Sequence, residues 1–140
     1  MNLLDTREFR AMTWNVQHRN GLSILVVEDH ALIALDLETM LLDLGAGQVT
    51  IASTVDQALQ LVATGLFDAA FLDVRLGEST CIPVAVALRE KHVPIVIVTG
   101  YDAETEMPAE FATGLRVPKP FQEKHINDVW RALVDSIQAK

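Results

Sequence analysis

From residue 23 onward, short apolar runs alternate with segments in which apolar residues recur every three or four positions. The apolar runs cover residues 23–27, 48–52, 68–72, 94–99 and 115–117. Strands that are apolar throughout are typical of parallel sheets, because helices cover both faces of such sheets. The alternation therefore predicts an α/β protein with a doubly wound sheet of five parallel strands.

Helices are predicted between these strands from their start and stop residues. The first helix should begin near Ala31 and end before Gly45. Thr54 and Gln57 have the spacing of a capping box, which predicts that the second helix begins there and ends at Gly65. Helices of this kind would cover both faces of the sheet.

Two more helices are predicted in the second half of the chain. Residues 83–91 should form one of them, with Pro83 in its first turn, and residues 122–138 the other. The connection 102–114 is different, because Pro108 lies in its middle and apolar periodicity is weak. Any helix there should be short or frayed.

Length and composition indicate one soluble domain. The chain has 140 residues, half of them hydrophobic, which is enough for one core. Residues 23–140 should form this domain, and residues 1–22 a leader that is either helical or disordered. No apolar run approaches the roughly 20 residues of a membrane span, so a cytoplasmic location is expected. The net charge of −8 disfavours nucleic acid as a partner.

Polar residues occur where the predicted strands end. Glu28 and Asp29 follow the first strand, Asp73 the third, Thr99 ends the fourth, and Lys119 follows the fifth. Right-handed crossovers bring the carboxyl ends of parallel strands to one edge of the sheet, and ligands bind there. These five side chains should therefore line one pocket.

The residue types in this pocket point to phosphoryl chemistry. Three clustered carboxylates would repel each other, and oxygen ligands of this kind suit Mg²⁺. Lys119 supplies a positive charge for a phosphoryl oxygen, and Asp73 can act as a nucleophile towards phosphorus. The pattern predicts Asp73 as a phosphoacceptor that depends on Mg²⁺ and Lys119.

At this point the chain resembles the receiver domains of bacterial two-component response regulators, over roughly residues 22–138. The motifs "ILVVEDH", "FLDVRLG", "IVIVTGYD" and "VPKPF" carry the resemblance by their order and spacing. It implies a flavodoxin-like, CheY-like fold with strand order 2-1-3-4-5. It also implies a stand-alone receiver, since the chain has little room for another domain.

The resemblance implies a role for each acidic residue. Asp73 would accept a phosphoryl group from a sensor histidine kinase. Glu28, Asp29 and Asp73 would hold Mg²⁺ together with the backbone carbonyl of Arg75. The domain would catalyse its own phosphorylation and slow dephosphorylation, and would otherwise not be an enzyme.

The resemblance further implies a switch. Thr99 would supply the switch hydroxyl and Lys119 would bind the phosphoryl group, with a cis peptide bond between Lys119 and Pro120. Receivers commonly have an aromatic residue where this chain has Arg116. Tyr101 is an alternative to that aromatic, so Thr99, Tyr101 and Arg116 are the switch candidates.

The expected partners are proteins. The "VTGYD" sequence is similar to that of stand-alone receivers that pair with HWE-type kinases, with Thr99 and Gly100 in register. A downstream protein would read the phosphorylated state, and a homodimer remains open.

Three other functions compete with this interpretation. A phosphatase with an aspartyl nucleophile usually has a second acid two residues further on, where this chain has Arg75. A flavin-binding protein would need a phosphate-binding loop after the first strand. A pseudo-receiver adaptor that is never phosphorylated would not need the complete set of acids, threonine and lysine.

Overall fold

The computed structural model describes residues 21–100 and 114–139. Five parallel strands form the central sheet in the order β2-β1-β3-β6-β7. They are β1 (Ser23–Val27), β2 (Gln48–Ala52), β3 (Ala69–Asp73), β6 (Ile95–Thr99) and β7 (Leu115–Pro118). Counted along the chain, β6 and β7 are the fourth and fifth strands of this sheet, because β4 (Arg75–Leu76) and β5 (Ser79–Thr80) form a separate hairpin. The predicted doubly wound sheet and its order 2-1-3-4-5 are therefore confirmed.

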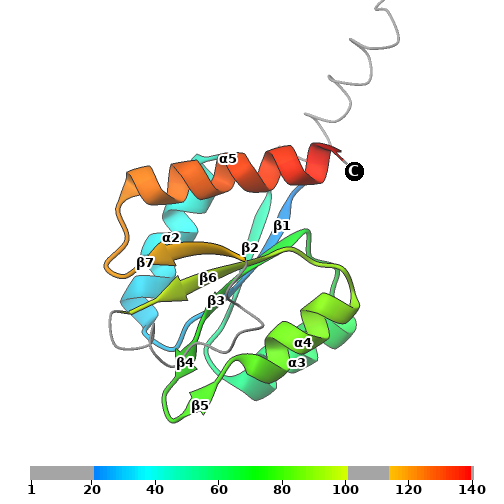
Figure 1. The fold of residues 1–140 in the computed structure, drawn as a ribbon. Helices are drawn as coiled ribbons and strands as arrows, with labels where there is room; N and C mark the ends of the chain where they lie inside the picture. The colour runs from blue at the N-terminus through cyan, green and yellow to red at the C-terminus, as the bar shows by residue number, and fades with distance from the viewer. Residues whose placement is uncertain (1–20, 101–113, 140) are drawn as a thin grey trace, which may run out of the picture.

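Helices cover both faces of this sheet (Figure 1). On one face lie α2 (Ala31–Asp43) and α5 (Glu123–Ala139), and on the other α3 (Val55–Thr64) and α4 (Ile82–Glu90). All four helices were predicted, with ends within two residues of those observed, and none of the described helices is long and apolar enough to cross a membrane.

Successive side chains of each strand point to opposite faces of the sheet, and this divides the core into two layers. Leu25 and Val27 pack against α3 and α4, whereas Ile24 and Val26 pack against α2 and α5. A strand covered on both sides must therefore be apolar at every position. This buried core fixes the positions of the polar residues at the carboxyl ends of the strands, Glu28, Asp73 and Thr99.

The start of α3 has most of the predicted capping box. Thr54 Oγ1 accepts a hydrogen bond from the N–H of Gln57 at 3.1 Å. The side chain of Gln57 reaches back to the N–H of Ser53 at 2.9 Å, one residue before the position expected for this motif. Gly65 follows the last residue of the helix, and the position favours glycine because a Cβ there would lie 2.9 Å from the carbonyl oxygen of Leu61.

Thr54→Ala is expected to lower the free energy of unfolding by about 1 kcal/mol, because the N–H of Gln57 loses its side-chain acceptor. Thr39→Ala is the matched control. The hydroxyl of Thr39 bonds the carbonyl of Leu35 within the exposed face of α2, so alanine should be neutral or slightly stabilising there. Urea unfolding of both variants measures the difference, and equal effects would contradict the capping role.

Several details differ from the predictions: β6 begins at Ile95, one residue later than predicted, and β7 ends at Pro118, one residue later than predicted. The third strand covers Ala69–Asp73, one residue later than predicted, so Asp73 is the last residue of the strand. A small antiparallel hairpin that was not predicted follows it, formed by β4 (Arg75–Leu76) and β5 (Ser79–Thr80). The predicted leader lies outside the described residues except for its last two, as do Tyr101 and the connection 102–114 apart from its last residue.

Candidate functional site

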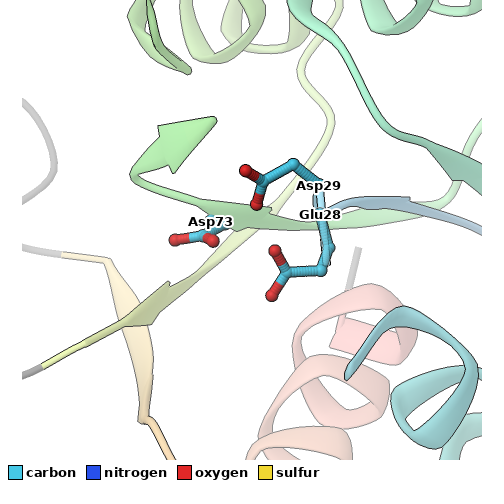
Figure 2. A group of neighbouring side chains, drawn as sticks. All are labelled: Glu28, Asp29 and Asp73. Atoms are coloured by element: carbon cyan, nitrogen blue, oxygen red, sulfur yellow. The ribbon is translucent and has the colours of Figure 1, made fainter. Parts of the chain in front are cut away.

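Three carboxylates meet at the carboxyl edge of the sheet (Figure 2). The pairing of Val27 with Leu72 places the residues after β1 level with the end of β3. Glu28, Asp29 and Asp73 each contribute one carboxylate oxygen to a group whose atoms lie within 4.8 Å of one another. The sequence therefore predicted correctly that these acids converge.

Lys119, the residue directly after β7, reaches into this group. Its Nζ lies 2.5 Å from Glu28 Oε1 and 2.7 Å from Asp73 Oδ2. Its backbone N–H donates to the carbonyl of Thr99 at 2.7 Å, which holds the backbone of Lys119 against the end of β6. The peptide bond from Lys119 to Pro120 is cis, as predicted. One ammonium group thus bridges two buried carboxylates.

Backbone N–H groups bind each of the carboxylates. The N–H of His30 donates to Glu28 Oε2 at 3.2 Å, and that of Arg75 lies 3.4 Å from Asp73 Oδ1. The third acid, Asp29, accepts from the N–H of Gly77 at 2.9 Å. Such bonds orient the carboxylates.

Charge is unevenly balanced in the pocket. Burial raises the pKa of Glu28 from 4.5 to about 7; the bond with Lys119 opposes this rise and the neighbouring Asp73 carboxylate adds to it. Burial alone would lower the pKa of Lys119, but its bonds to Asp73 and Glu28 outweigh burial and raise it. A single lysine therefore does not compensate for the carboxylates, and the pocket favours further positive charge.

The arrangement fits a magnesium ion. All three side chains offer oxygen, which a hard divalent cation prefers. Mg²⁺ binds oxygen at about 2.1 Å, so ligand oxygens on opposite sides of the ion are roughly 4.2 Å apart. A group of oxygens within 4.8 Å needs only a small contraction to reach that geometry.

The other predicted residues have different surroundings. Thr99 is buried at the end of β6, at the same edge of the sheet as the acids. Arg116 is exposed on β7, opposite Ile97 of β6. Arg75 is exposed as the first residue of the hairpin, and His30 is exposed where α2 begins.

Sequence reasoning missed Gly77. Its N–H binds Asp29 although the two residues are 48 positions apart. The available signal was the pair Gly77-Glu78 within "RLGEST", since glycine at the first position of a two-residue turn is typical of hairpins. Runs of two residues on either side were too short to be noticed as strands.

Comparison with known proteins agrees with this geometry. Residues 24–131 match the family described as the response regulator receiver domain. The solution structure of SdrG from Sphingomonas melonis Fr1 superposes with a TM-score of 0.72 at 37% identity, covering 81% of this chain and 96% of that one. A response regulator receiver protein from Sinorhizobium medicae gives 0.69 at 25% identity, covering 83% and 96%.

A longer protein is also similar in sequence. The phyllosphere-induced regulator PhyR of Methylorubrum extorquens is 31% identical over 115 residues, which are 76% of this chain. The similarity spans only 41% of PhyR, so less than half of that protein is matched. The family match covers most of the described fold, including all three acids and Lys119. This chain belongs to the family of response regulator receiver domains.

Proposed function

We propose that the protein is a single-domain response regulator in which Asp73 accepts a phosphoryl group from a histidine kinase. The observation that carries this proposal is the contact of Lys119 Nζ with Asp73 Oδ2 at 2.7 Å, beside two further carboxylates. A nucleophilic oxygen, a cation for the transferred group and a set of metal ligands thus lie together. Receiver domains are signalling domains, and phosphorylation would be the signal.

The chain's own residues would act on the phosphoryl group as follows. An Oδ atom of Asp73 forms the new P–O bond, while the P–N bond of a phosphohistidine breaks and its electron pair stays with the imidazole. Lys119 Nζ binds a phosphoryl oxygen in place of its present contact with Asp73. A bound Mg²⁺ supplies charge neutralisation for the same oxygens. Glu28, Asp29 and Asp73 would hold that ion, together with the backbone carbonyl of Arg75.

The response would begin at Thr99. Thr99 ends β6, the strand next to β3, one residue after the Val98 that pairs with Asp73, so a small movement of its hydroxyl towards a phosphoryl oxygen would be the trigger. Arg116 occupies the place of the usual aromatic residue and is exposed. Its guanidinium would transmit the movement of Thr99 through a contact with a charged group of the partner protein. Tyr101 remains a predicted switch residue outside the described part of the chain.

We infer partners of several kinds. A sensor kinase, of HWE type by the resemblance of "VTGYD", would donate the phosphoryl group in the cytoplasm, and a downstream protein would bind the phosphorylated form. A homodimer is a further arrangement of the active form. The net charge of −8 opposes DNA as the target, because DNA binding needs a basic face. We assign residues 23–140 to the receiver unit, and Leu22 directly before it packs into the same core.

Phosphorylation with a small-molecule donor tests the proposed function. The purified protein incubated with Mg²⁺ and acetyl phosphate should gain the mass of one phosphoryl group, and omission of Mg²⁺ should prevent this. A change in retention volume on gel filtration would report a dimer. Phosphate should be released slowly after each modification, whereas fast steady-state hydrolysis of several small phosphate esters would support a phosphatase instead. No mass gain under any of these conditions would contradict the proposal and favour a pseudo-receiver.

A further inference from the structure

The β4–β5 hairpin contacts the acidic site through its turn. Arg75 pairs with Thr80 and Leu76 with Ser79, which leaves a loop of two residues, Gly77 and Glu78. Gly77 has a φ of +62°, and among the described residues that are not glycine only His92 has a positive φ. Glycine first, followed by a residue with negative φ, is the signature of a type II′ turn.

This turn leaves one backbone donor free to bind elsewhere. In a two-residue hairpin the cross-strand hydrogen bonds join the residues on either side of the turn, here Leu76 and Ser79, and do not use the N–H of the first turn residue. The N–H of Gly77 donates instead to Asp29 Oδ2 at 2.9 Å. The positive φ of Gly77 therefore aims a donor at the carboxylate.

The base of the hairpin is anchored in the core. Leu76 and Cys81 are buried in the cluster beneath α4, and the N–H of Cys81 donates to the carbonyl of Val74 at 3.0 Å. Asp29, in contrast, is exposed. An exposed carboxylate thus receives a hydrogen bond from a backbone segment that is anchored in the protein interior.

We propose that Gly77 is a positioning residue for the metal site, because its N–H holds the carboxylate of Asp29 in the orientation that binds Mg²⁺. The inference rests on the proposed function, in that it takes Asp29 as a metal ligand. Outer-shell hydrogen bonds orient metal ligands, and their loss typically weakens metal affinity about 10- to 100-fold. A preoriented ligand also loses less rotational freedom when the ion binds. Metal affinity then depends on the conformation of the hairpin.

Gly77→Val is the direct test. A Cβ at this position would meet nothing within 4 Å, so the β-carbon of the new side chain has room. Valine does oppose a positive φ, however, and so reorients the N–H. Mg²⁺ titration followed by the backbone amide resonances of Glu28 and Asp29 should show affinity weakened about tenfold.

Two further variants separate conformation from bulk. Glu78→Val places the same side chain in the same turn without altering the donor to Asp29, and should leave the affinity unchanged. Gly77→Asn should recover most of the wild-type affinity, because asparagine tolerates a positive φ. Equal affinity of wild type and a folded Gly77→Val would overturn the inference while leaving the proposed function intact. A wild-type protein that binds no Mg²⁺ would overturn both.

Amide exchange in the wild type provides a test that does not require Gly77→Val to fold. The amide hydrogen of Gly77 should exchange more slowly than that of Glu78, its exposed neighbour in the turn, and Asp29→Ala should remove the difference. Equally fast exchange of both amides in the wild type would overturn the inference.

Discussion

Asp73→Asn is expected to abolish phosphorylation of the protein by acetyl phosphate in the presence of Mg²⁺. An amide oxygen is a poor nucleophile towards phosphorus, and the substitution also removes one negative charge from the metal-binding group of three acids. Mass spectrometry of the intact protein measures the labelled fraction. The expected change is from substantial labelling to none.

Asp36→Asn is the control for this experiment. Asp36 is an exposed aspartate on α2, outside the group of acids that could hold a metal. The same chemical change there should leave labelling as in the wild type. Undiminished labelling of Asp73→Asn would show that another residue is the acceptor.

Glu28→Gln is expected to stabilise the metal-free protein strongly at pH 8. The pKa of Glu28 is raised from 4.5 to about 7 in the folded state, so ionised Glu28 destabilises the fold. This penalty is absent well below pH 4.5, grows between pH 4.5 and 7, and is complete above pH 7. At about 1.4 kcal/mol for each pH unit, it amounts to about 3 kcal/mol at pH 8 and less than about 1 kcal/mol at pH 5.

Urea unfolding in the presence of EDTA measures this gain at both pH values. Glu90→Gln, at the exposed end of α4, is the matched control and should change the free energy of unfolding little at either pH. A gain for Glu28→Gln that is the same at pH 5 and pH 8 would show that ionisation of the buried Glu28 carboxyl is not its source. The result would also separate stability from metal binding, which the variant should weaken.

Much of the fold could be predicted because its three central strands are apolar at almost every position. Runs such as residues 23–27 are recognisable only because both faces of the sheet are covered. The convergence of Glu28, Asp73 and Lys119 followed from topology, since parallel strands present their carboxyl ends at one edge. Apolar runs of five or more residues were therefore enough to predict the central strands and the edge of the sheet at which the site lies.

The remaining features depend on contacts that no local pattern encodes. Strands of two residues, as in the hairpin, have no measurable periodicity, and the bond between Gly77 and Asp29 joins distant parts of the chain. The shift of β3 by one residue depends on the register of Asp73 with Val98 of β6. Likewise, the sequence gives no reason for the side chain of Gln57 to bind Ser53 rather than Thr54.

The edge position of β7 has a consequence for assembly. In the described chain β7 pairs with β6 alone, so its other side is the open edge of the sheet. Arg116 places an exposed charge on this edge, and Pro118 has no N–H to offer an incoming strand. Both features protect against strand addition and edge-to-edge aggregation. Two copies that associate here would therefore meet through side chains, and their sheets would stay separate.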